Sequence, residues 1–315
     1  MPNWQSAFSA RLAHLVRTPG GGFGRDTALL RRRYDSLFAR FETAPTGVTF
    51  EAGQAGPIKG EWVRPTGISP ERMILYLHGG GFVAGSPLTH RALVARLCMA
   101  AQAAAFVPTY RLAPEFPFPA GLRDAVDTYR HFVQRGVAVR SIALAGDEAG
   151  GGLAFSLLHA IRNGGLPMPA ACAALSPWVD LSLSGWSTLD NAKRDILLSW
   201  EMLFVSARHY LQKSSPADPY ASPVFASFRE FPPLMVHAGA LEILRDDASR
   251  IGERAAEAGI PVSVEIYDRM GHLFQASPGI AEARISLDRL GQFIRTRTAE
   301  AAGQAPSSQA AGREF

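Results

Sequence analysis

The stretch IALAGDEAGGGLAF, residues 142–155, carries the clearest indication of fold in the chain. It passes from an uninterrupted apolar run into a turn flanked by Gly146 and Gly150, and then into a segment with helical periodicity. A strand that is apolar on both faces is typical of a parallel sheet covered by helices on both sides. The residue at the tip of the turn is Glu148, and what that side chain does there is the main question about function.

Other short apolar runs occur along the chain at residues 73–79, 103–110, 171–177, 233–239 and 262–268. Most of them are separated by segments of helical periodicity, at 88–101, 121–134, 152–161 and 246–258. Parallel strands need long crossover connections, so this alternation predicts an α/β fold with an open, mostly parallel, doubly wound sheet. Looser alternation around residues 48–50 and 58–63 predicts an antiparallel pair at one edge.

The chain has 315 residues, of which 47% are hydrophobic, and this predicts one large domain with a small appendage. We expect N-terminal cap helices over 1–45, a core in two parts at 46–184 and 216–298, a cap insertion at 185–215 and a disordered tail at 299–315. The insertion includes an aromatic-rich helical segment at 197–211. Together the cap segments predict a lid over the C-terminal edge of the sheet, where open α/β sheets bind ligands.

The first 45 residues predict two amphipathic helices. In the first, Trp4, Phe8, Leu12 and Leu15 recur at helical spacing, which favours a packed helix over a transit peptide. The stretch contains no continuous apolar region followed by a small-residue cleavage site, so no secretory signal is expected. The second is expected to begin after an N-cap at Asp26 and to present one apolar face, made of Leu30, Tyr34, Leu37, Phe38 and Phe41.

Composition excludes several classes of function. The net charge is +4, from 32 Lys and Arg against 28 Asp and Glu, and the basic residues are scattered except at 31–33, where we expect a solvated helix face and no nucleic-acid site. No apolar run reaches eighteen residues, so no membrane span is expected. Cys98 and Cys172 lie among apolar residues, which predicts two buried thiols and a reducing, cytoplasmic location. Without metal-ligand spacing or a dinucleotide signature, we expect no metal and no cofactor.

A triple-glycine motif, HGGGFVAGS at 78–86, directly follows an apolar run. Because Gly79, Gly80 and Gly81 have no Cβ atoms, a negatively charged oxygen can approach their backbone N–H groups closely. The motif can also be only a flexible strand-to-helix loop. A histidine before the glycines and an aromatic residue after them favour an oxyanion hole.

Two loops after later apolar runs carry titratable side chains. GALEILRDD, residues 239–247, contains Glu242, Asp246 and Asp247, and DRMGHLFQ, residues 268–275, contains His272. Taken singly, the carboxylates can cap a helix and the histidine can be structural. GDEAG, residues 146–150, has the spacing of the G-x-S-x-G nucleophile elbow, and the order tip residue, acid, histidine is that of a catalytic triad on an α/β sheet. The order therefore favours catalysis.

In sequence order, these motifs resemble the hormone-sensitive-lipase-like branch of the alpha/beta hydrolases, also called bacterial family IV esterases. The resemblance covers about residues 30–295 and includes YRLAPEFPFPA at 110–120, SPWVDLS at 176–182 and DPYASP at 218–223. It implies an alpha/beta hydrolase fold with a helical cap and the hydrolysis of short-chain acyl or aryl esters. It also implies a homodimer formed through the last strand, which 262–268 can provide as an exposed edge.

The resemblance also implies roles for individual residues. Gly80, Gly81 and Ala149 would supply the oxyanion donors, His272 the base, and Glu242 the acid, at a position where aspartate is commoner in the family. The expected substrate pocket consists of His78, Gly79, Phe82, Tyr110, Asp147 and Trp178. Two serines near the expected site, Ser176 and Ser222, are interpreted as structural.

The departure from the family lies at Glu148, where the family has serine. Glutamate has no hydroxyl group to attack an ester, and beside His272 it is expected to form an ion pair that favours the imidazolium, which cannot act as a base. Because Glu242, His272 and the glycines all remain, we expect an ester hydrolase scaffold whose esterase activity is impaired or altered.

Two other interpretations remain open. Glu148 and His272 can serve as an acid–base pair, or Glu148 as a carboxylate nucleophile, in a lyase, cyclase or epoxide-hydrolase-like enzyme. Alternatively, the chain binds a small molecule without chemistry, although the intact acid and histidine count against this interpretation.

Overall fold

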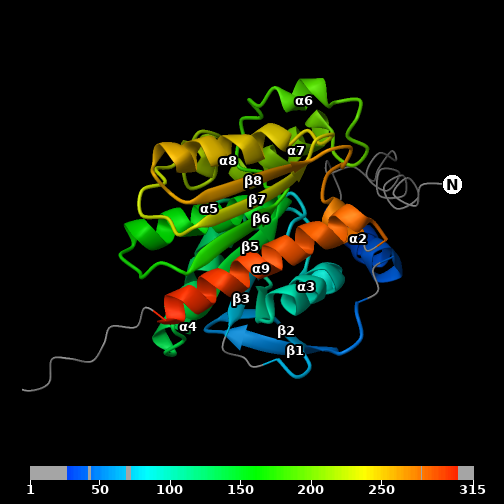
Figure 1. Cartoon of the computed structure of the whole chain (residues 1–315). Helices are drawn as coiled ribbons and strands as arrows, with labels where there is room; N and C mark the ends of the chain where they lie inside the picture. Colours follow the sequence, from blue (N-terminus) through cyan, green and yellow to red (C-terminus); the bar gives the residue numbers. More distant parts are fainter. Residues whose placement is uncertain (1–26, 42–43, 69–71, 278, 304–315) are drawn as a thin grey trace, which may run out of the picture.

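The computed structural model describes residues 27–41, 44–68, 72–277 and 279–303, and these form an eight-stranded sheet with helices on both faces (Figure 1). The strands lie in the order β1-β2-β4-β3-β5-β6-β7-β8. Their bounds are β1 Val48–Ala55, β2 Ile58–Pro65, β3 Met73–Leu77, β4 Ala104–Pro108, β5 Ile142–Asp147, β6 Ala171–Leu175, β7 Leu234–Gly239 and β8 Val262–Tyr267. Every apolar run predicted as a strand is a strand, which confirms the α/β architecture.

Strand directions also follow the prediction. β1 pairs with β2 antiparallel, and β2 pairs with β4 antiparallel, so the looser N-terminal strands form one edge of the sheet. All other neighbouring pairs are parallel. β8 is the last strand at the opposite edge.

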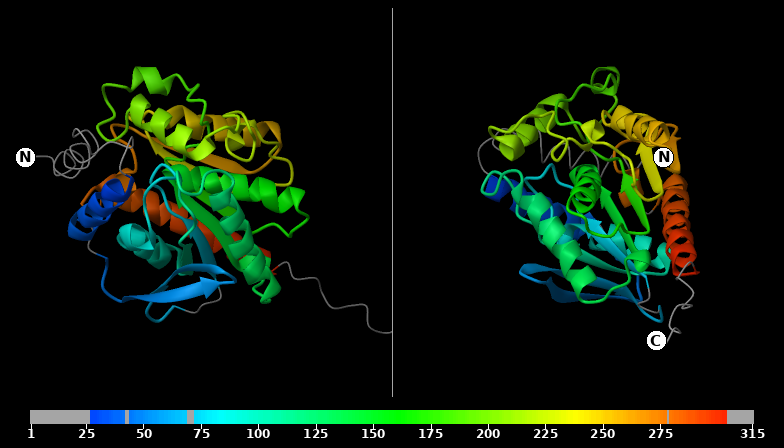
Figure 2. Two further views of the ribbon diagram at one scale, coloured as in Figure 1. Left: turned by 180° about the vertical axis from the view of Figure 1, so that it is seen from behind. Right: turned by 90° about the vertical axis from the view of Figure 1, so that its left-hand side faces the viewer.

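Helices cover both faces of the sheet (Figures 1 and 2). α3 (Pro87–Ala101) and α9 (Ala281–Gly303) pack on one face, and α4 (Ala120–Gln134), α5 (Glu148–Asn163) and α8 (Arg245–Glu257) on the other. On β3, Ile74 and Tyr76 belong to the core beneath α3 and α9, whereas Leu75 and Leu77 belong to the core beneath α5. Both faces of the strand are buried, which explains why its sequence is uniformly apolar.

The parallel register places the ends of the central strands side by side. Leu77, the last residue of β3, pairs with Gly146 near the end of β5, and Gly239 of β7 pairs with Tyr267 of β8. The loops that follow these strands therefore leave the sheet at the same edge. All the predicted catalytic and oxyanion residues lie in or directly after these loops.

The predicted cap insertion contains α6 (Ser187–Asp190) and α7 (Trp200–Leu211), which lie together on the side of α8 and away from β1 (Figures 1 and 2). Of the two predicted N-terminal helices, the structure describes the second as α2 (Thr27–Phe41). The first helix and the expected N-cap at Asp26 lie outside the described residues.

Arg31 on α2 departs from the expectation of a solvated Arg triplet, whereas Arg32 is exposed as expected. Its guanidinium donates hydrogen bonds to the carbonyl oxygens of Val83 and Ala113, each at 2.8 Å, and pairs with Glu115 at 2.8 Å. Val83 lies in the glycine-rich loop, so Arg31 attaches α2 to the loop that follows β3.

The two cysteines are buried and free, as predicted, and burial raises the pKa of both thiols. At the C-terminus, α9 continues to Gly303, so residues 299–303 are helical where the composition predicted disorder. The rest of that tail lies outside the described residues. None of the helices in the described ranges is long and apolar enough to cross a membrane.

Close packing of α5 on the sheet predicts an effect on stability at Gly152. A Cβ atom on this residue would overlap the carbonyl oxygen of Trp178. Alanine in a helix is normally favoured over glycine by about 0.5–1 kcal/mol, but overpacking of this kind costs about 1–3 kcal/mol. We therefore expect Gly152→Ala to lower the free energy of unfolding, measured by urea denaturation.

The matched control is Gly164→Ala at the C-cap of the same helix, where the nearest atom to a new Cβ would be Ala160 O at 3.0 Å. It should change the free energy of unfolding by less than about 0.5 kcal/mol. A more stable Gly152→Ala variant would contradict the close approach of α5 to the segment after β6.

Candidate active site

The candidate active site lies at the edge of the sheet where β3, β5, β7 and β8 end. The glycine-rich loop follows β3, Glu148 follows β5, Glu242 follows β7 and His272 follows β8. The structure thus brings together groups that lie up to about two hundred residues apart in the sequence, as the chain order predicted. Among the described residues, no cluster of His, Cys, Asp and Glu could hold a metal ion.

Glu148 lies at a sharp strand-to-helix turn. Its φ is +47°, in the left-handed region that L-residues seldom adopt, and its side chain is only 6% exposed. Gly146 and Gly150 allow this turn because a Cβ on Gly150 would overlap the carbonyl oxygen of Leu77, and one on Gly146 would lie 2.5 Å from the carbonyl oxygen of Gly150. The geometry is that of the predicted elbow, with glutamate at its tip.

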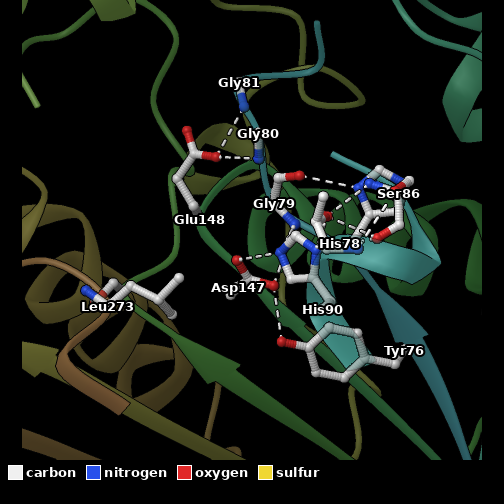
Figure 3. Close-up of polar contacts among 12 residues, drawn as sticks. Tyr76, His78, Gly79, Gly80, Gly81, Ser86, His90, Asp147, Glu148 and Leu273 are labelled. Atoms are coloured by element: carbon white, nitrogen blue, oxygen red, sulfur yellow. Dashed lines mark hydrogen bonds and ion pairs between the residues drawn. The ribbon is translucent and has the colours of Figure 1, made fainter. Parts of the chain in front are cut away.

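The Glu148 carboxylate is bound by the glycine-rich loop (Figure 3). Gly80 and Gly81 donate their backbone N–H groups to Oε2 of Glu148, at 2.6 and 2.8 Å. Gly80 has a φ of +120° and Gly81 a φ of +61°, and this loop conformation turns both N–H groups toward the same oxygen. The two groups predicted as oxyanion donors therefore hold an anion that belongs to the chain itself.

This contact corrects the expected ion pair between Glu148 and His272. In the described part of the chain, the Glu148 side chain bonds only to Gly80 and Gly81, and the His272 imidazole only to Glu242. The Glu148 carboxylate gains two charge-assisted hydrogen bonds from fixed N–H groups, whereas the imidazole of His272 would offer it one. Glu148 still acts on His272, but through its charge at longer range.

Glu242 and His272 form the predicted acid–histidine pair. His272 Nδ1 donates to Glu242 Oε2 at 2.6 Å, and the other carboxylate oxygen accepts from Gly239 N at 2.6 Å. Both residues are buried. Asp246 and Asp247, the other two candidates in this loop, point elsewhere: Asp246 accepts from Ser187 N, and Asp247 from the N–H groups of Val179 and Asp180.

Ser176 connects the acid loop to the histidine loop. Its hydroxyl donates to Glu242 Oε1 at 3.0 Å and accepts from Leu273 N at 3.1 Å, and it is fully buried. Leu273 directly follows His272, so one serine is bonded both to Glu242 and to the backbone beside His272. Ser222 accepts from Leu181 N at 2.8 Å, and neither serine is hydrogen-bonded to His272.

The surroundings of His272 favour its protonated form. Burial lowers the pKa of this imidazole, but the hydrogen bond and charge of Glu242 raise it, with smaller contributions from Asp195 and Glu148, and the net value is about 9. The negative charges around the imidazole, chiefly that of Glu242, therefore stabilise its protonated form.

Asp147, predicted to line the pocket, supports the glycine-rich loop from below (Figure 3). It is 1% exposed and accepts from the Tyr76 hydroxyl at 2.7 Å, Gly79 N at 3.1 Å and His90 Nε2 at 3.2 Å. Burial alone would raise its pKa, but His90 and Tyr76 lower it and keep it ionised. Tyr76 and His90 were not predicted from the sequence. Asp147, the partner of both, lies 71 residues from Tyr76 and 57 residues from His90 in the chain.

The remaining predicted pocket residues are aromatic and buried. Tyr110 stacks on His78 at 4.2 Å between ring centroids and donates to the His78 carbonyl oxygen at 2.6 Å. Burial and the neighbouring His90 lower the pKa of His78 to about 3, so His78 is neutral. Phe82 stacks at 3.9 Å on Tyr210 of α7, which joins the glycine-rich loop to the cap.

Trp178 and Ala149 complete the predicted set. Trp178 is fully buried, lies 5.8 Å from Phe82 between ring centroids and donates Nε1–H to Asp180 O. Ala149 is the second residue of α5 and is also buried. The N–H groups in the first turn of a helix have no partner within it, so that of Ala149 is available to an anion at the helix N-terminus.

Comparison with known proteins agrees with the fold. A family described as alpha/beta hydrolase fold matches residues 74–276. An "Acetyl-hydrolase" of Streptomyces hygroscopicus is 41% identical over 246 residues, which cover 78% of this chain and 82% of that protein. The crystal structure of an esterase from the bacterial hormone-sensitive lipase family has a TM-score of 0.88 at 35% identity, over 93% of this chain and 97% of that one.

A second solved structure is EstE5, from a crystal soaked with p-nitrophenyl butyrate, with a TM-score of 0.85 at 35% identity over 93% of this chain and 99% of that one. Both structural similarities extend over most of the chain. On the evidence of sheet, elbow, acid–histidine pair and relatives together, the chain belongs to the hormone-sensitive-lipase-like carboxylesterases of the alpha/beta hydrolase superfamily.

Proposed function

We propose that the chain is a carboxylic ester hydrolase scaffold for short-chain acyl or aryl esters, in which Glu148 impairs the classical reaction. The observation that carries this proposal is the position of the Glu148 carboxylate on the N–H groups of Gly80 and Gly81. An ester's carbonyl oxygen would need these same donors when it becomes negatively charged. Glu148 therefore removes the nucleophile and also competes for the oxyanion site.

The other parts of the site support an ester hydrolase. With a serine hydroxyl at position 148, His272 Nε2 would take its proton, because Nδ1 is held by Glu242. The N–H groups of Gly80, Gly81 and Ala149 would stabilise the tetrahedral oxyanion, and His272 would then protonate the leaving alcohol. Water would complete the cycle by hydrolysing the acyl-enzyme with His272 as base again.

The interpretation of Glu148 and His272 as an acid–base pair has less support. Such an enzyme needs the Glu148 carboxylate to reach its substrate, whereas two N–H groups hold it against the glycine-rich loop. A binding protein without chemistry would have no need of the short Glu242–His272 hydrogen bond or of Ser176, which aligns the pair.

The relatives support a short acyl group. The Streptomyces protein is named an acetyl-hydrolase, and EstE5 was soaked with a butyrate ester. Buried aromatic rings of Phe82, Tyr110, Trp178 and Tyr210 pack around the glycine-rich loop, and they are suited to a compact apolar substrate. We include in this proposal the pocket residues expected from the sequence, a homodimer through β8 and a cytoplasmic location.

Replacing Glu148 by serine tests the proposal. We expect Glu148→Ser to raise kcat/KM for p-nitrophenyl butyrate by at least about 10³-fold, because it supplies the nucleophile and frees the two N–H groups. Glu148→Ala is the matched control, since it frees the same donors without supplying a hydroxyl group. Its activity should stay far below that of the serine variant.

A fluorophosphonate probe gives an independent readout. It should label the Glu148→Ser variant at residue 148 and leave the unchanged chain unlabelled. A correctly folded serine variant that stays inert would overturn the esterase proposal and favour small-molecule binding. Labelling of the unchanged chain at Ser176 or Ser222 would show that the nucleophile lies elsewhere.

The pKa of His272 gives a second prediction. Because the folded value of about 9 exceeds the ordinary 6.5, the stabilisation from its imidazolium is complete below pH 6.5 and is lost as the pH rises through 9. Glu148→Gln removes one of the nearby negative charges and should lower this pKa, measured by NMR titration of the imidazole. Glu257→Gln, which removes an exposed carboxylate on α8, is the control and should leave it unchanged.

A further inference from the structure

Three buried polar side chains in the cap insertion lie four residues apart in the sequence. They are Ser187 and Asn191, both 0% exposed, and Asp195, 2% exposed. None of them belongs to the predicted site. Burying such groups is costly unless they are hydrogen-bonded. All three side chains form hydrogen bonds with the loop of residues 240–246, which carries Glu242.

Asn191 and Asp195 bond to the backbone on both sides of the acid. Asn191 Nδ2 donates to the carbonyl oxygens of Ala240 and Glu242, at 3.0 and 2.9 Å. Asp195 Oδ2 accepts from Ile243 N at 2.9 Å. The peptide group that follows Glu242 is thus held at its carbonyl oxygen and at its N–H, and the peptide group between Ala240 and Leu241 is held at its carbonyl oxygen.

Ser187 holds the next part of the same loop. Its hydroxyl donates to Ile243 O at 2.8 Å and accepts from Asp246 N at 3.1 Å, while its own N–H donates to Asp246 Oδ2 at 2.8 Å. Asn191 and Asp195 bond to the first part of the loop, and Ser187 bonds to the part that follows. The cap therefore contacts the loop from Ala240 to Asp246.

The loop's own backbone bonds are long by comparison. Glu242 N lies 3.5 Å from Gly239 O, and Arg245 N lies 3.3 Å from Glu242 O. Hydrogen bonds weaken with such lengthening, so the turn that carries the acid depends on bonds from outside it.

We propose that Ser187, Asn191 and Asp195 form a cap clamp that positions the Glu242 carboxylate against His272. The clamp residues act through the backbone of the acid loop and are positioning residues, since none of them touches the reacting atoms. Their role in ester hydrolysis rests on the proposed function. Through the clamp, the cap insertion becomes part of the acid–base unit as well as a cover for the pocket.

Asp195 also contributes a charge. The carboxylates that act on His272 are Glu242, which is hydrogen-bonded to it, and Asp195 and Glu148, which act at longer range. Burial raises the pKa of Asp195 and the neighbouring His272 opposes this. Asp195 is thus placed to stabilise the imidazolium that forms when His272 takes a proton.

The kinetic test uses the Glu148→Ser background. Asp195→Asn keeps the size of the side chain but removes its charge and one of its two acceptor oxygens. We expect kcat for p-nitrophenyl butyrate to fall about tenfold to a hundredfold, as for a displaced catalytic group, with little change in KM. Asn191→Ala removes both bonds to the acid loop without removing a charge and should also lower kcat. Asp190→Asn, an exposed neighbour on α6, is the matched control and should change neither constant.

The second readout is the NMR titration of His272 in the unchanged Glu148 chain, which does not depend on ester hydrolysis. Asp195→Asn should lower the His272 pKa, and Asp190→Asn should not. If the Glu148→Ser variant is inactive, the proposed function is wrong, but the pKa of His272 in the unchanged chain still tests the clamp. If Asp195→Asn and Asn191→Ala lower only the melting temperature and leave kcat and the His272 pKa unchanged, the clamp proposal is wrong.

Discussion

Two backbone N–H groups that point at one oxygen atom are the interaction on which the rest of the site depends. Gly80 and Gly81 can present these groups because their φ angles are positive and because β3 lies beside β5 in the sheet. Asp147 holds the loop from below through Gly79, and Arg31 holds its far end through Val83. The anion site is therefore built from rigid elements before any ligand arrives.

Glu148 is compatible with this framework, and this explains how a glutamate can occupy an elbow built for a shorter side chain. The anion site supplies the carboxylate with two hydrogen bonds at 2.6 and 2.8 Å, which compensate for its burial. The same contacts draw the carboxylate away from His272. His272 keeps its short bond to Glu242, and the acid–histidine pair remains assembled at the same edge of the sheet as Glu148.

The cap is tied to the core at two places near the chemistry. Phe82 and Tyr210 stack between the glycine-rich loop and α7, while Ser187, Asn191 and Asp195 bond to the loop that carries Glu242. The first contact is apolar and the second is polar and buried. A buried polar contact specifies position more strictly than an apolar one, because each donor and acceptor must meet its partner in direction as well as in distance.

Local sequence patterns determined most of the fold. Uniform apolar runs such as residues 73–77 and 142–145 identify strands buried on both faces, and the glycines of the elbow identify a turn into a helix, because these properties depend on near neighbours in the chain. The order of Glu148, Glu242 and His272 indicated which residues meet, since parallel strands end at one edge of the sheet. The boundary of α9 was missed. The environment of Arg31 was also missed, because its partners lie 52 to 84 residues away in the chain.

Only the tertiary structure decided which groups bond to one another within the site. From the sequence, Glu148 was expected to pair with His272, the nearest opposite charge in the assembled triad. In the folded chain, Gly80 and Gly81 take its carboxylate, because their N–H groups are fixed in direction and lie closer. Tyr76, His90 and Asp195 carry no local pattern that marks them, and the motif that contains Ser176 does not indicate the bond of this serine to Glu242. They became part of the site because the fold places each beside a partner far away in the sequence, and hydrogen bonds depend on that proximity.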